Sequence, residues 1–186
     1  MRRLMTKNLL AALEFAAGAH LGQKRKDPEG SPYISHPFAV GLVLERLGYE
    51  EDVVIAGILH DVIEDTNFTI RDIESKFGKK VAKFVLGVTE KNKLDSWEKR
   101  KIDYRENLKE QPGEALAISG ADLLCNRLDL LMRLQTGVLE ALNKFEVSLH
   151  TILDNDKKRI EIIKRGVSGE LIHEIEKIER ELEKYA

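Results

Sequence analysis

The chain has 186 residues, a length that fits one domain able to bury about two thirds of the surface that its unfolded form exposes. Thirty Lys and Arg residues against 32 Asp and Glu give a net charge of −2, which supports no general attraction to nucleic acid or to an anionic membrane. The single cysteine, Cys125, excludes an internal disulfide, and nothing in the composition suggests an oxidising compartment.

Apolar residues recur at helical spacing along almost the whole chain. The N-terminal stretch begins basic and continues apolar, as a signal peptide does, but Glu14 interrupts the apolar run, so we interpret it as an amphipathic helix. No run of about 18 apolar residues occurs, which argues against a membrane span, and we expect a soluble cytoplasmic protein. Helices are expected over residues 5–20, 37–47, 51–64, 70–77, 79–90, 97–110, 114–134, 137–165 and 168–185.

The breaks between these helices coincide with turn and capping residues. Residues 22–33, "GQKRKDPEGSPY", form a loop with two prolines, Gly48 separates two helices, Thr69 caps the next, and Gly78 closes it. No segment alternates as a strand does, and no repeat or linker divides the chain. We therefore predict one all-α domain over residues 1–186, a compact bundle of about eight to ten helices.

Residues 59–66, "LHDVIEDT", place ionisable side chains in an apolar stretch. On a single helix His60 and Glu64 would share one face, while Asp61 and Asp65 would share another, about 100° away. A carboxylate in such surroundings is costly unless it is paired or bound to a metal ion. The alternative is that the helix simply reaches solvent at this point.

Two other places in the chain favour a metal site. His36 precedes Pro37 in "PYISHPF", where the proline ring fixes the backbone at the start of a helix. Asp122 lies in an apolar helical run, with Asn126 one turn later on the same face. Mixed nitrogen and oxygen ligation with positions open for water suits Mn²⁺ or Fe²⁺ better than Zn²⁺ or Mg²⁺. Two imidazoles and two carboxylates would suffice for one ion: His36, His60, Asp61 and Asp122.

This succession resembles the H…HD…D pattern of the HD-domain metal-dependent phosphohydrolases, a family of all-α proteins. The segments "GQKRKDPEGSPYISHP", "LHDVIEDT" and "GADLLCNRLDL" resemble more narrowly the hydrolase domain of the RelA/SpoT family, and most of all its free-standing form, the Mesh1-type small alarmone hydrolases. The resemblance covers about residues 14–131, and residues 137–186 would add C-terminal helices. It implies a manganese-dependent guanosine-3′,5′-bis(diphosphate) 3′-pyrophosphohydrolase, which converts ppGpp or pppGpp to GDP or GTP and pyrophosphate.

The resemblance also assigns roles to single residues. The metal ligands would be His36, His60, Asp61 and Asp122. Glu64 and Asp65 would position or deprotonate the attacking water, which suits carboxylates one turn after the ligands. Arg25 and Lys26 would hold the guanine base, since a guanidinium can stack on a purine, and Asn126 would contact the substrate.

The chain departs from the family pattern near Asp122. Ser119 and Leu123 stand where relatives commonly have basic residues, and of the nucleotide-pocket residues expected within 138–147 only Phe145 and Glu146 are recovered. The base and phosphate preference therefore stays open. One alternative is an HD-type phosphohydrolase that acts on another nucleotide, such as ppApp or a nucleotide phosphate ester. The other is a non-catalytic nucleotide-binding module.

Three further features have two interpretations each. The basic cluster over residues 99–101 is an ordinary solvated patch or part of an anion site, and we favour the patch. Tyr33, beside the predicted metal site, would touch substrate or simply pack. The final helix would dock on the rest of the chain or face a partner, so that self-association is left open.

Overall fold

The computed structural model describes residues 5–25, 30–91, 94–137 and 147–186. It divides into two compact units, Met1–Thr89 and Glu90–Ala186. Within the described residues the regular structure is helical, and the extended pairing is limited to one isolated bridge between Lys24 and Pro32. This confirms the predicted all-α class, whereas the assignment of residues 1–186 to a single domain stays a prediction.

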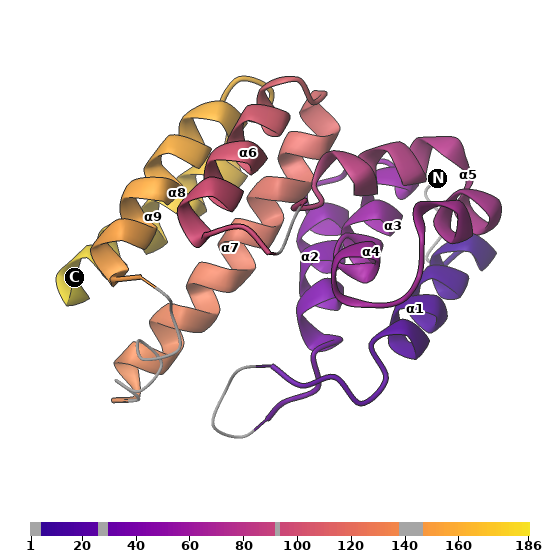
Figure 1. The fold of residues 1–186 in the computed structure, drawn as a ribbon, viewed down its shortest axis with the longest axis horizontal. Helices are drawn as coiled ribbons and strands as arrows, with labels where there is room; N and C mark the ends of the chain where they lie inside the picture. The colour runs from indigo at the N-terminus through magenta and orange to yellow at the C-terminus, as the bar shows by residue number, and fades with distance from the viewer. Residues whose placement is uncertain (1–4, 26–29, 92–93, 138–146) are drawn as a thin grey trace. The chain divides into compact units, whose positions relative to one another are not determined.

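The first unit is built around one buried helix. It contains α1 (Lys7–Ala19), α2 (Ser35–Arg46), α3 (Glu51–Leu59), α4 (Val62–Asp65) and α5 (Ile70–Gly87) (Figure 1). Every residue of α3 from Val53 to Leu59 is buried, and the helix packs against α1, α2 and α5. Because α3 is apolar all round, it serves as the core of this unit.

Two glycines bring α2 and α3 into close contact. A Cβ atom added at Gly57 would lie 2.4 Å from Leu44 Cδ1, and one added at Gly41 would lie 2.4 Å from Ile58 Cγ1. Real Cβ atoms do not approach other atoms so closely, so each helix packs into a space that the glycine of the other leaves.

The helix expected over residues 51–64 is interrupted. α3 ends at Leu59 and α4 begins at Val62, with a ψ angle of −7° at Asp61. At this junction the Gly57 carbonyl accepts a hydrogen bond from the His60 ring at 2.8 Å. His60 and Asp61 therefore lie at a turn between two helices, not on one continuous helix with Glu64 and Asp65.

The predicted break at Gly78 is confirmed. Gly78 has φ +86° and ψ 167° inside α5, a conformation that glycine adopts without strain, and it kinks the helix there. At the start of α5 Thr69 and Asp72 form a capping box, in which the Asp72 carboxylate accepts from the Thr69 backbone N–H at 2.7 Å.

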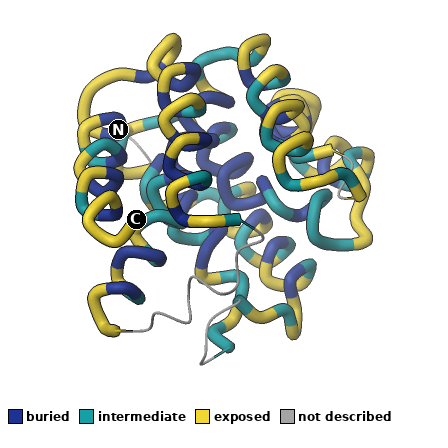
Figure 2. The backbone as a smooth tube through the Cα atoms, turned by 60° about the vertical axis from the view of Figure 1, so that its left-hand side comes forward, coloured by how far each residue is buried: buried dark blue, intermediate teal, exposed yellow. Residues whose placement is uncertain are grey.

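The second unit contains α6 (Trp97–Lys109), α7 (Gly113–Gln135), α8 (Leu149–Ile163), α9 (Glu170–Leu182) and the short 3₁₀ helix η2 (Glu183–Tyr185). α7 packs against α8 and α9, and α6 packs against α8. Buried and exposed stretches alternate along these helices, as amphipathic helices around a core require (Figure 2). One apolar cluster of the core comprises Leu130, Leu131, Leu134, Leu149, Leu153, Ile178 and Leu182.

This unit also has charged residues in its interior. Arg127 on α7 donates to the buried Asp156 on α8, and Glu179 on α9 lies 3.8 Å from Arg127 Nε. The helix expected over residues 137–165 is observed only in part, as α8 from Leu149 to Ile163. Residues 147–148 are not helical, and residues 138–146 lie outside the described part of the chain. None of the described helices combines the length and hydrophobicity that a membrane-spanning helix requires.

Candidate metal centre

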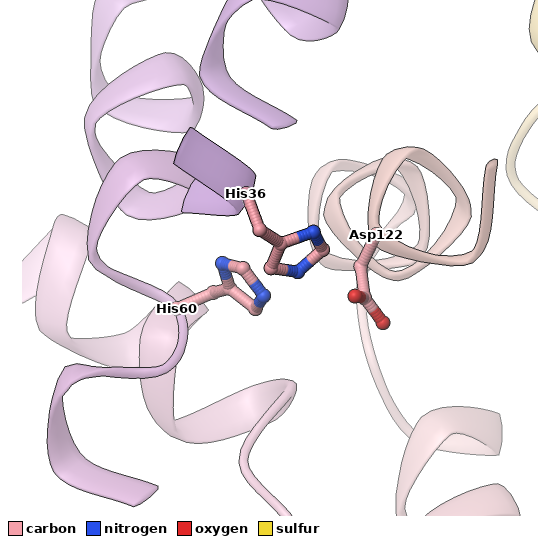
Figure 3. Close-up of side chains that lie close together, drawn as sticks. All are labelled: His36, His60 and Asp122. Carbon is pink, nitrogen blue, oxygen red and sulfur yellow. The ribbon is translucent and has the colours of Figure 1, made fainter. Parts of the chain in front are cut away.

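Two buried histidines of the first unit lie side by side. His36 is the second residue of α2, directly before Pro37, and His60 follows the last residue of α3. Their ring centroids are 5.2 Å apart, and their side chains are only about 4% exposed (Figure 3). The close α2–α3 packing thus brings two imidazoles from different helices to one place.

The His60 ring is oriented by its own helix. Its Nδ1 donates to the Gly57 carbonyl at 2.8 Å, which leaves the Nε2 lone pair of the neutral ring directed away from the helix. Nε2 lies 3.1 Å from Asp61 Oδ2, and His36 Nε2 lies 3.7 Å from the same oxygen. Two imidazole nitrogens and a carboxylate oxygen are a donor set that fits a divalent cation.

Tyr33 holds Asp61 in this position. Its hydroxyl donates to Asp61 Oδ2 at 2.6 Å, and its ring lies near those of both His20 and His36, with centroid distances of 5.0 and 6.1 Å. Burial raises the pKa of Tyr33 well above its ordinary value, and the nearby Asp61 and Asp65 carboxylates raise it further. The hydroxyl therefore stays protonated and remains a donor.

The two candidate water-positioning carboxylates are on α4. Glu64 and Asp65 are partly buried, and the Asp65 backbone N–H donates to the Asp61 carbonyl at 2.8 Å, so that Asp65 follows Asp61 by one helical turn. The Asp65 carboxylate also raises the pKa of the Tyr33 hydroxyl, which donates a hydrogen bond to Asp61. Asp65 therefore lies near the same Tyr33 hydroxyl that holds Asp61 beside the two histidines.

Asp122 belongs to the second unit and is held on both carboxylate oxygens. Asn126 Nδ2, one turn later on α7, donates to Oδ1 at 2.6 Å, and Arg159 Nη2 on α8 donates to Oδ2 at 2.8 Å. Asn126, predicted to contact the substrate, therefore contacts Asp122 in this structure. His36, His60 and Asp122, drawn in Figure 3, each offer one atom that could ligate a metal ion.

The basic residues of the first loop are only partly described. The Arg25 side chain is partly buried, and its backbone N–H donates to the Ser31 carbonyl at 2.8 Å, which fixes the loop next to the bridge between Lys24 and Pro32. Lys26 lies outside the described residues, as do Phe145 and Glu146 of the expected nucleotide pocket.

The basic cluster at residues 99–101 has local acidic partners. Lys99 Nζ lies 2.7 Å from Asp95 and 3.2 Å from Asp103, and Lys101 donates to Glu90. Since these carboxylates compensate the two lysines, the contacts agree with a solvated charged patch better than with an anion site.

Arg159 is the contact of Asp122 that the sequence did not indicate. It lies 37 positions after Asp122, in the stretch "DNDKKRIEII", where nothing distinguishes it from the two lysines before it. Only the packing of α7 against α8 brings the two together.

Three comparisons place this chain among known proteins. A family model described as "HD domain" matches residues 12–140. The human guanosine-3′,5′-bis(diphosphate) 3′-pyrophosphohydrolase MESH1 is 40% identical over 124 residues, which are 66% of this chain and 69% of that protein. The Aquifex aeolicus guanosine-3′,5′-bis(diphosphate) 3′-pyrophosphohydrolase is 45% identical over 94 residues, which are 50% of this chain and 13% of that protein.

Solved structures are similar as well. One, described as a metazoan orthologue of SpoT that hydrolyses ppGpp, matches with a TM-score of 0.82 and 30% identity, over 96% of this chain and 97% of that one. Another, lmo0812 from Listeria monocytogenes, matches with a TM-score of 0.70 and 31% identity, over 82% of this chain and 98% of that one.

Proposed function

The chain belongs to the HD domain family, and we propose that it is a metal-dependent hydrolase that removes the 3′-pyrophosphate of ppGpp or pppGpp. The observation that carries this proposal is the convergence of His36 and His60 on one oxygen of Asp61. Relatives that are at least 30% identical are named for this activity, which supports the same substrate here.

The metal ion would be bound by His36, His60, Asp61 and Asp122. The donor set fits, because the His60 tautomer leaves Nε2 available as a ligand and both Asp122 oxygens are oriented by neighbours. Manganese is the ion we propose, since two imidazoles and two carboxylates with open positions suit it. A divalent ion there would polarise a phosphoryl oxygen and lower the pKa of water.

The protein's own groups would direct the water. Asp65, and Glu64 beside it on α4, would accept a hydrogen bond from the attacking water and take its proton. The water oxygen would bond to the phosphorus attached to O3′, the P–O3′ bond would break, and O3′ would receive a proton. The products are GDP, or GTP from pppGpp, and pyrophosphate. Tyr33 would keep Asp61 in place during this exchange.

The nucleotide would be held by the first loop and α7. Arg25 and Lys26 would contact the guanine base and Asn126 would contact the substrate in addition to Asp122. A second candidate is the same hydrolysis on another nucleotide, such as ppApp or a nucleotide phosphate ester. It is favoured by Ser119 and Leu123, which are uncharged and fully or almost fully buried.

Product analysis tests the proposal. The protein, loaded with Mn²⁺, is incubated with ppGpp, ppApp and a panel of nucleotide phosphate esters, and the products are separated by ion-exchange chromatography. We expect GDP and pyrophosphate from ppGpp, and no product after a chelator has removed the metal. Turnover of ppApp or of an ester with ppGpp intact would favour the second candidate.

A lack of turnover and a comparison of metal ions give two further tests. No turnover with any substrate, although metal is bound, would contradict hydrolysis and favour a nucleotide-binding module. Parallel loading with Mn²⁺, Fe²⁺, Zn²⁺ and Mg²⁺ tests the ion, and we expect the highest rate with Mn²⁺.

A further inference from the structure

Arg159 links α8 to the candidate ligand on α7. We propose that Arg159 is a positioning residue, which holds the Asp122 carboxylate in the orientation that the metal ion needs and supplies the positive charge that position 119 lacks. The inference rests on the proposed role of Asp122 as a ligand, and it adds a residue that the family motif does not contain.

The guanidinium of Arg159 is fixed by several contacts in the second unit. Nε donates to Ser119 Oγ at 3.0 Å, and Nη2 donates to the Ser119 carbonyl at 2.6 Å as well as to Asp122 Oδ2 at 2.8 Å. The guanidinium carbon lies 5.1 Å from the centre of the Tyr104 ring. Since the side chain is only 11% exposed, the orientation of Arg159 is set by these partners.

The environment makes the Asp122 contact strong. Tyr104 is buried, and burial raises its pKa to about 12, so its hydroxyl stays neutral and donates to Ser119 Oγ at 3.2 Å. Within the described part of the chain, Asp122 is the carboxylate that accepts a hydrogen bond from Arg159. A buried guanidinium requires such a counter-charge, and a charge-assisted hydrogen bond to a carboxylate is stronger than one between neutral groups.

The geometry also restricts how Asp122 can rotate. Asn126 holds Oδ1 from α7 itself, whereas Arg159 holds Oδ2 from the neighbouring helix α8. A carboxylate held on both oxygens keeps one plane, and each oxygen retains a lone pair for a metal ion. Partners of this kind usually change metal affinity or activity by about 10 to 100-fold when they are removed.

Position 119 explains why the charge comes from α8. Ser119 is fully buried, and both its hydroxyl and its carbonyl accept from Arg159. The guanidinium therefore occupies the space into which a longer side chain at position 119 would extend. A lysine at 119 could replace Arg159 only if the arginine were shortened.

Mn²⁺ titration of variants tests this role. Isothermal titration is carried out on the wild type and on the Arg159→Met, Arg159→Lys and Ser119→Lys/Arg159→Ala variants, with circular dichroism to verify folding. We expect Mn²⁺ affinity to fall about 10 to 100-fold in Arg159→Met and less in Arg159→Lys, which keeps the charge without the forked donors. The double variant should regain part of the affinity.

A matched control is available in the same unit. Arg105 on α6 donates to Asn155 on α8 and, among the described contacts, not to Asp122. Arg105→Met should change the melting temperature but leave Mn²⁺ affinity within about twofold. Unchanged Mn²⁺ affinity in folded Arg159→Met, or an equal loss in Arg105→Met, would overturn the inference. If Arg159→Met does not fold, the Mn²⁺ affinity of Arg159→Lys decides instead, and an unchanged affinity in that variant would overturn the inference.

Turnover separates this inference from the proposed function. With ppGpp as substrate, excess Mn²⁺ should restore most of the rate of Arg159→Met, because a misplaced ligand weakens metal binding without removing the water-positioning carboxylates. A rate that stays low at saturating Mn²⁺ would contradict a positioning role. A wild type that binds Mn²⁺ and leaves ppGpp intact would refute the proposed substrate, and the Mn²⁺ titration would still decide the role of Arg159.

Discussion

Asp65 differs from its neighbour Asp61 in what it contacts. Asp61 Oδ2 lies 3.1 Å from His60 Nε2, whereas Asp65 is one turn further along α4 and raises the pKa of the Tyr33 hydroxyl. We therefore predict that Asp65→Asn keeps Mn²⁺ affinity within about threefold but lowers ppGpp turnover about 10² to 10⁴-fold, the usual contribution of a general base. Isothermal titration with Mn²⁺ and a product assay on the same preparation measure both effects.

The same substitution elsewhere in the unit serves as the control. Asp72 caps α5 through Thr69 and is exposed, so Asp72→Asn should lower the melting temperature slightly without changing either Mn²⁺ binding or turnover. Loss of Mn²⁺ binding in Asp65→Asn would mean that Asp65 is itself a ligand, contrary to the role proposed for it.

Single residues of the site differ in how far the sequence could predict them. His60 and Asp61 are adjacent in the chain, so their proximity follows from the motif alone. The alternatives for Tyr33 could not be separated, because its hydrogen bond to Asp61 spans 28 positions and depends on the loop conformation. Arg159 could not be found at all, since an arginine that follows two lysines has no local feature that marks it.

The position of His36 relative to His60 depends on how closely α2 and α3 pack. Gly57 lies one turn before His60 and leaves no room for a Cβ atom against Leu44. We predict that Gly57→Ala destabilises the protein by about 1 to 3 kcal/mol, the usual cost of overpacking, because the fully buried Leu44 must repack. We also predict weaker Mn²⁺ binding, because this repacking shifts α3 relative to α2. Urea denaturation followed by circular dichroism and a Mn²⁺ titration measure the two effects.

Gly18→Ala is the corresponding control in α1. A Cβ atom at Gly18 would meet nothing within 4 Å, and alanine is the better helix former, so this variant should be as stable as the wild type or slightly more so. If Gly57→Ala were destabilised while Mn²⁺ affinity stayed the same, the spacing of the two histidines would not depend on this helix contact.

Helix boundaries show where sequence patterns suffice. Gly78 interrupts α5 as predicted, because a glycine between two amphipathic segments can adopt a positive φ angle. The break after Leu59 was missed, because no glycine or proline marks it and apolar residues resume at Val62 and Ile63. The hydrogen bond from the His60 ring to the Gly57 carbonyl is a property of the folded turn.

For the whole molecule, the all-α class followed from composition and periodicity, because amphipathic helical spacing covers nearly the entire chain. The family prediction, HD-domain phosphohydrolases of the RelA/SpoT type, is confirmed by the match over residues 12–140 and by the relatives. The division at Thr89 was not predicted, since no change of composition or long linker marks it. Division into units depends on which helices pack together, and that information is not local.

The stability of the protein should depend on pH through a carboxyl group outside the site. Glu179 on α9 is buried, and neither of its oxygens has a hydrogen-bond partner among the described residues. Burial raises its pKa to about 8, and Asp156 raises it too, while Arg127 and Lys157 oppose the shift. In the unfolded chain the value would be near 4.5.

The direction of the effect follows from these two pKa values. Between about pH 4.5 and 8 the folded protein holds a proton on Glu179 that the unfolded chain releases, so the free energy of unfolding falls as pH rises, by at most about 1.4 kcal/mol per pH unit. Glu179→Gln imitates the protonated group, so its stability advantage over the wild type should be small near pH 4.5 and grow up to pH 8. Urea denaturation at several pH values measures it.

Glu176→Gln provides the comparison on the same helix. The partly exposed Glu176 carboxylate pairs with Lys164 at 2.7 Å, and this hydrogen bond lowers its pKa, so the group titrates below the range of pH 4.5 to 8. Its replacement should therefore leave the slope between pH 4.5 and 8 unchanged. Parallel pH curves for Glu179→Gln and the wild type would show that Glu179 is ionised in the folded protein, with Arg127 compensating both its charge and that of Asp156.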